Sequence, residues 1–93
     1  MKEVAFTIIL TGGATWDDLA TDASIPTRVK RLQFKNRSAN DVKYTDQSDG
    51  DPYDTIPAGI GYDTGLAPVG VWFSPALYLN GTAADVIEGT YIT

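Results

Sequence analysis

Short runs of alternating apolar and polar residues, each ended by a turn-forming residue, dominate this chain of 93 residues. The clearest run covers residues 4–11 and stops at Gly12-Gly13. Its main apolar positions are Val4, Phe6, Ile8 and Leu10. Because successive side chains of a β-strand point to opposite faces, this period of two predicts a strand with one face in the core.

Similar runs follow along the whole chain. They predict strands at 28–36, 41–45, 60–64, 69–74, 76–79 and 85–92. Frequent turn signals and almost no helical periodicity favour an all-β fold: a small antiparallel β-sandwich, jelly-roll-like, with residues 1–93 as a single domain. At most one short helical turn is expected, near residues 15–20, where Thr15 and Asp18 have capping-box spacing. Trp16 and Leu19 are expected to share one face over the core.

Two segments of the chain resemble each other. Residues 36–42 and 80–86 each place Asn at the end of one predicted strand and Asp-Val at the start of the next. We interpret them as two equivalent hairpin connections, although convergent turn chemistry explains the likeness as well. The first connection would make residues 28–45 a pair of adjacent strands.

The basic residues are concentrated in that predicted strand pair. Six of the seven lie between Arg28 and Lys43, and none follows Lys43. On adjacent strands their charges would form one patch. The patch is either a solvated sheet face, neutralised by the acidic loop after it, or an interface for an acidic surface of another copy or another protein. The candidate interface residues from this set are Arg28, Arg31, Lys35, Arg37 and Lys43.

Trp72 and Phe73 complete the candidate interface. They are adjacent in a predicted strand, so their side chains should point to opposite faces, and one of them should leave the core. An exposed aromatic ring stacks on a sugar or contacts another subunit. Because a domain of this size has little stability to spare, we expect a homo-oligomer, with a trimer favoured.

Residue types that are missing from the chain exclude much chemistry. Without Cys or His there is no disulfide, thiolate nucleophile, imidazole base or transition-metal site of the usual kind, so neither an enzyme nor a bound cofactor is expected. The adjacent carboxylates Asp17 and Asp18 are interpreted as complements to the first turn of a helix. Residues 46–54 carry four aspartates, which form a solvated or salt-bridged acidic loop, a calcium loop, or a contact with the basic strand pair of another subunit.

Charge and hydropathy also limit the expected partners. The net charge of −5 argues against nucleic acid as a partner. No apolar run approaches the length of a membrane span. The first residues do not resemble a signal peptide, so we expect synthesis in a cytoplasm without export.

Two stretches of turn chemistry occur together in this chain: Ile56-Pro57-Ala58-Gly59, and residues 76–86, which begin Ala-Leu-Tyr-Leu-Asn-Gly. With the strand–turn–strand unit at 32–44, they resemble small β-sandwich accessory proteins of tailed bacteriophage virions, such as capsid decoration (cement) proteins and head-fibre or tail modules. The resemblance covers residues 32–92. It implies a non-enzymatic structural protein, often trimeric, at symmetry positions of an icosahedral shell, and it carries over no functional residues.

This resemblance gives two expectations for function. The first is a decoration protein on the capsid surface of the virion, made in the host cytoplasm, which binds and stabilises neighbouring major capsid subunits. The alternative is a carbohydrate- or receptor-binding module of a phage fibre or tail that uses exposed Tyr and Trp side chains.

Overall fold

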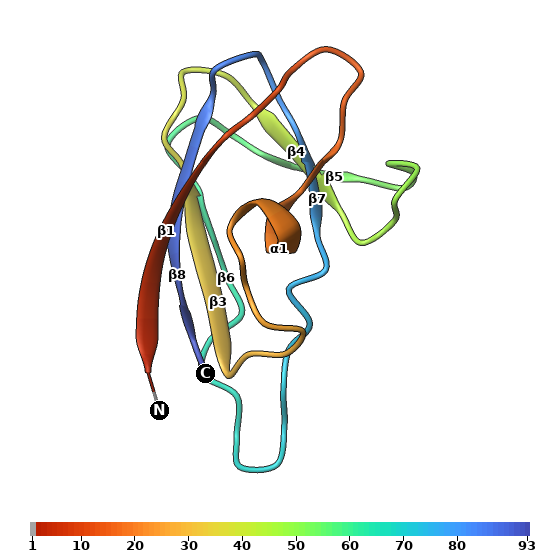
Figure 1. Cartoon of the computed structure of the whole chain (residues 1–93). Coiled ribbons are helices and arrows are strands. Elements are labelled where there is room, and N and C mark those ends of the chain that lie inside the picture. The colour runs from red at the N-terminus through yellow and green to blue at the C-terminus, as the bar shows by residue number, and fades with distance from the viewer. Residues whose placement is uncertain (1) are drawn as a thin grey trace.

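Two antiparallel sheets of four strands each make up the computed structural model, which describes residues 2–93 (Figure 1). The first sheet has the order β1 (Glu3–Ile9), β8 (Val86–Ile92), β3 (Arg31–Asn36) and β6 (Gly61–Asp63). The second sheet has the order β2 (Asp17–Asp18), β7 (Tyr78–Asn80), β4 (Val42–Thr45) and β5 (Asp54–Ile56). The prediction of a small all-β sandwich is confirmed.

The strands pair in a nested order. β1 pairs with β8, β2 with β7, β3 with β6, and β4 with β5. Two further pairs, β3 with β8 and β4 with β7, complete the sheets. The chain is therefore one long hairpin, folded over so that consecutive strands lie in different layers, except for β4 and β5 at its closed end.

The core lies between the apolar faces of the two sheets. Period-two alternation places Leu32 and Phe34 of β3 inside, with 0% and 3% of their surface exposed, against Val42 and Leu79 of the second sheet, both at 0%. The strand predicted at 4–11 is present as β1, and its inward residues Phe6, Ile8 and the following Leu10 are buried. Burial of these faces is the main favourable term in folding.

Gly89 of β8 makes room for Phe34 of the neighbouring strand. It lies in register between Phe6 of β1 and Phe34 of β3. A Cβ atom at Gly89 would lie 2.7 Å from the Cβ of Phe34. A glycine in this central strand therefore allows the neighbouring rings and backbones to approach closely.

The only helix in the described residues starts later than predicted. α1 (Leu19–Asp22) is capped by Asp18, whose Oδ1 accepts the N–H of Thr21 at 3.2 Å, so the cap is not Thr15. Residues 17–18 are extended because they pair with β7. In residues 2–93 no helix has the length and apolar content to cross a membrane.

Trp16 and Leu19 were expected to share one face, but they do not. Its ring lies against Gly50, where no Cβ would fit, and 6.1 Å from the ring centroid of Tyr53. Leu19 is fully buried in the core. The expectation is wrong because residues 16–18 are not helical.

The two similar segments are not hairpins. β3 belongs to the first sheet and β4 to the second, and the chain returns from the second sheet to the first between β7 and β8. Residues 36–42 and 80–86 are therefore both crossings between the layers. The prediction that the two strands in 28–45 are adjacent is wrong, because the chain reverses direction between them by passing to the other sheet.

A fully buried amide fixes the first crossing. The Nδ2 of Asn36 donates to the carbonyl oxygens of Asn40 at 2.7 Å and of Ile56 at 3.0 Å. Its Oδ1 accepts the N–H of Ser38 at 3.0 Å. The second crossing lies against the first, because Asn40 Nδ2 donates to Asp85 Oδ1 at 3.2 Å.

Replacing Asn36 with Ala should lower the free energy of unfolding by roughly 1–3 kcal/mol, because it leaves buried carbonyl and N–H groups without partners. Chemical denaturation measures the loss. Asn40→Ala is the matched control, since that side chain is exposed, and it should cost less. An equal or smaller loss for Asn36→Ala would contradict the role of this amide.

Candidate functional site

The loop between β6 and β7 exposes apolar side chains at its far end. Of the seven large hydrophobic residues that are exposed within residues 2–93, four lie here: Leu66, Val69, Val71 and Trp72. We call these four residues the apolar tip. The loop projects beyond the C-terminal end of the chain at the lower end of the molecule (Figure 1). Clustered exposed apolar groups of this kind mark interaction sites.

A turn places Val69 at the outermost point. The N–H of Val71 donates to the carbonyl of Pro68 at 3.0 Å, and Gly70 has a φ of +81°. A positive φ at the third position of a turn is the type II geometry that favours glycine. The side chain of Val69 is as accessible as in an extended peptide, at 102%.

The base of the loop is anchored to the body of the protein. Val29 and Phe73 exchange two backbone hydrogen bonds, of 2.9 and 2.8 Å, and the N–H of Ala67 donates to the carbonyl of Lys30 at 2.7 Å. Val29 is fully buried, and Phe73 packs against the core. These contacts give the loop a fixed shape before any partner binds, which reduces the entropic cost of binding.

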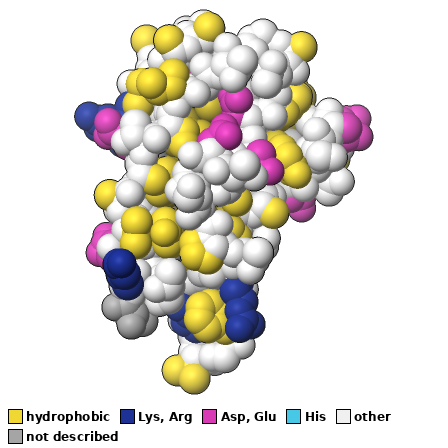
Figure 2. Space-filling model, viewed as in Figure 1, with side chains coloured by type: hydrophobic (Ala, Val, Ile, Leu, Met, Phe, Trp, Pro, Cys, Tyr) yellow, Lys and Arg dark blue, Asp and Glu magenta, His cyan; other side chains and the backbone are white. Residues whose placement is uncertain are grey.

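Lys30 supports the loop from one side. Its Nζ donates to the carbonyl oxygens of Pro68 at 2.9 Å and Val71 at 2.6 Å. The same atom lies 4.7 Å from the ring centroid of Trp72, and the guanidinium of Arg28 lies 4.8 Å from it. Figure 2 shows apolar side chains flanked by basic ones at this end of the molecule. Cations at this distance are attracted by the aromatic ring.

Trp72 and Phe73 do point in different directions, as the sequence indicated. Trp72 is exposed, and Phe73 contributes to the core. The predicted strand at 69–74 is wrong, however, because only Phe73 makes a β-bridge. Sequence reasoning also missed Leu66, Val69 and Val71 as surface residues, although Pro68 and Gly70 signalled a turn in this apolar run.

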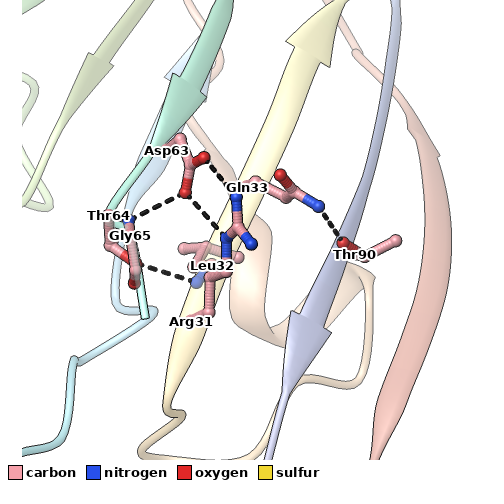
Figure 3. Close-up of polar contacts among 7 residues, drawn as sticks. All are labelled: Arg31, Leu32, Gln33, Asp63, Thr64, Gly65 and Thr90. Carbon is pink, nitrogen blue, oxygen red and sulfur yellow. Dashed lines mark hydrogen bonds and ion pairs between the residues drawn. The ribbon is translucent and has the colours of Figure 1, made fainter. Parts of the chain in front are cut away.

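The predicted basic patch is divided between separate parts of the surface. Arg31 of β3 forms two hydrogen bonds with Asp63 of β6, at 3.1 and 2.6 Å (Figure 3). The hydrogen bonds from Arg31 and from the N–H of Gly65 hold the pKa of Asp63 below its usual range. Arg37 lies 3.5 Å from Glu88.

Of the two other cations predicted on these strands, Lys43 lies apart from these pairs and Lys35 lies beside them. Lys43, on the second sheet, lies 4.7 Å from the ring centroid of Tyr53. Lys35 is exposed on β3 and lines a shallow hollow of about 560 Å³ together with Arg37, Asp63 and Glu88. Of the predicted interface residues, the structure brings Arg28 to Trp72 and adds Lys30 to them. It also gathers Arg31, Lys35 and Arg37 on the first sheet, where Asp63 and Glu88 lie among them.

The aspartates singled out in the sequence have local structural contacts. The prediction that Asp17 and Asp18 complement the first turn of a helix is confirmed for the cap residue Asp18 and wrong for Asp17, which lies in β2 and bonds to Thr11. Asp17 is buried and accepts hydrogen bonds from the N–H and hydroxyl of Thr11, at 2.9 and 2.7 Å. Asp49 accepts the N–H of Asp51 at 3.1 Å in the 46–54 loop. Within residues 2–93, no three side chains of Asp or Glu gather in a way that could hold a metal ion.

Comparisons with known proteins give no relative: no family model, curated protein or solved structure matches the chain.

Replacing Lys30 with Met should loosen the apolar tip, because it keeps the aliphatic stem but removes the two hydrogen bonds to the loop. In a Trp16→Phe background, Trp72 is the only tryptophan. Its fluorescence anisotropy should fall and its quenching by acrylamide should rise, while the free energy of unfolding changes by less than about 1 kcal/mol.

Lys43→Met is the matched control, since Lys43 also lies over an aromatic ring but not in the loop. It should leave the fluorescence anisotropy and the acrylamide quenching of Trp72 unchanged. Identical fluorescence in the two variants would show that Lys30 does not hold the loop.

Proposed function

We propose that the protein is a non-enzymatic structural protein that binds its partner through the apolar tip, and that it serves as a capsid decoration protein of a phage virion. The observation that carries this proposal is the anchored loop that exposes Leu66, Val69, Val71 and Trp72. A fixed apolar surface with an aromatic centre has the character of a protein–protein interface.

The surroundings of the tip favour a partner surface with acidic groups. Arg28 and Lys30 flank Trp72, whereas the chain as a whole carries a net charge of −5. Opposite charges around an apolar contact fix its orientation and raise the association rate. We propose that this surface belongs to the major capsid protein, at a seam between subunits.

The strand order supports the virion part of the proposal. We infer that the nested pairing of eight strands in two sheets is a jelly roll. Double-sheet jelly rolls occur in viral capsid domains and also in lectins. Together with the resemblance to decoration proteins, the fold is compatible with a shell-bound module that acts in many copies, where modest affinity at each site becomes large in total.

Val69→Asp should weaken binding to shells without unfolding the protein, because it places a charge within the apolar contact. The test uses purified phage shells that lack the chain, to which labelled protein is added before sedimentation. We expect the wild type to co-sediment, and Val69→Asp to bind at least about tenfold more weakly.

Ile60→Asp is the matched control, since Ile60 is also exposed but lies outside the tip. It should bind like the wild type. Absence of the wild-type protein from the shells would contradict the decoration role, and equal binding by Val69→Asp would contradict the role of the tip.

One observation favours the alternative, a carbohydrate-binding module. Tyr53 is half-exposed beside a hollow of about 310 Å³ that Tyr44, Asp46 and Asp54 also line. Aromatic rings and carboxylates together suit a sugar. Trp72 is less suited to stacking, because Lys30 already lies over its ring.

If the alternative holds, a glycan array should give binding by the wild type that is lost in Tyr53→Ser and retained in Val69→Asp. No binding to any glycan, or loss of binding in Val69→Asp alone, would contradict a sugar site at Tyr53.

A further inference from the structure

Within residues 2–93, β1 is the only long strand at an open edge of the sheets. The four edge strands are β1 and β6 in the first sheet and β2 and β5 in the second. β6, β2 and β5 have three, two and three residues, but β1 has seven. Short edge strands offer few unpaired backbone groups, and a long one is a template for another strand.

The hydrogen bonds beside β1 show which of its backbone groups are free. The N–H of Thr93 donates to the carbonyl of Lys2 at 2.9 Å, and the N–H of Leu10 donates to the carbonyl of Asp85 at 2.8 Å. Residues of an antiparallel strand direct their backbone groups alternately to the two sides. The even-numbered residues therefore bond to β8, and the odd-numbered ones face the open side: Glu3, Ala5, Thr7 and Ile9.

This edge carries little of the usual protection against pairing. Its sequence, EVAFTII, contains no Pro and no Lys, and its single charge is at the first position. The side chains of Ala5 and Thr7 are small or neutral, and Ile9 is 67% exposed. Natural edge strands are normally blocked by charges, prolines or bulges.

We propose that β1 pairs with β1 of a second copy of this chain, antiparallel across a two-fold axis at Phe6. In this register Ala5 lies opposite Thr7 of the other copy, and Glu3 lies opposite Ile9. All four open residues of each strand then form hydrogen bonds. The two first sheets become one sheet of eight strands.

Charge favours a second copy as the occupant. The acidic chain would repel itself in most contacts, but β1 holds only Glu3 and is preceded by Lys2. In the proposed register the two Glu3 side chains lie at opposite ends of the contact. The pairing closes as a dimer rather than as the trimer that the resemblance implies, and it leaves the apolar tip free.

Sedimentation of the intact protein tests the proposal. The wild type should sediment as a dimer of about 20 kDa, twice the chain mass of 10.0 kDa. Thr7→Pro removes an N–H that faces the open side, so it should keep the fold and raise the dissociation constant of the dimer at least tenfold. Thr7→Val keeps the N–H and should remain dimeric.

A second variant tests the same pairing if the Thr7→Pro protein fails to fold. The double change Ala5→Lys and Thr7→Lys places like charges opposite one another and should give a folded monomer. A monomeric wild type at about 100 µM, a trimer, or a dimer that persists in both the proline and the lysine variants would overturn the proposal.

Cysteine variants test the register, since the chain has no cysteine of its own. When Ala5→Cys and Thr7→Cys proteins are mixed and oxidised, the mixed disulfide should predominate. Predominance of either symmetric disulfide would overturn the proposed register.

Discussion

The structure depends on two of the places where the chain passes from one sheet to the other, residues 36–42 and 80–86, and the buried side chain of Asn36 fixes the first of these two. A buried amide without partners costs free energy, so its donors and acceptor must be satisfied together. They are satisfied only when β3 ends at Asn36 and the 38–40 turn lies over Ile56. Because Asp85 at the second crossing accepts a hydrogen bond from Asn40 at the first, the two crossings are held side by side.

This arrangement decides how charge is distributed. If β3 and β4 were neighbours, the basic residues would form one patch. Since the strands lie in different sheets, Arg31 and Arg37 are paired with acids of the first sheet, and Lys43 lies on the second. The cations next to an apolar surface are Arg28 and Lys30, at the base of the loop that carries Trp72.

The sequence predicts the local features of this fold well and its long-range features poorly. Alternation identifies β1 and the inward residues Leu32 and Phe34. Pro57 and Gly59 identify the turn at 57–59, where the N–H of Ile60 donates to the carbonyl of Pro57. Turn residues such as Asn36 show that the chain reverses, but they do not say which sheet the next strand joins. That choice depends on contacts with residues distant in sequence, such as Ile56.

The same limit applies to the candidate site. Apolar residues at 69–74 suit a strand by composition, and only the backbone contacts of Val29 and Lys30 make this segment a loop. The opposite directions of Trp72 and Phe73 were predictable, because adjacent side chains diverge in an extended chain. The exposure of Val69 was not predictable, because it follows from the turn at Gly70 and from the distance of the loop from the core.

The central claim is that the apolar tip has a fixed shape in the free protein, and amide hydrogen exchange followed by NMR tests it most directly. The amides of Ala67 and Phe73 are hydrogen-bonded to the carbonyls of Lys30 and Val29, whereas no hydrogen bond is present for the amides of Val69 and Gly70. The account predicts that Ala67 and Phe73 exchange slowly, like strand amides, while Val69 and Gly70 exchange fast. Equally fast exchange at all four amides would show that the loop is not held in place and would contradict the account.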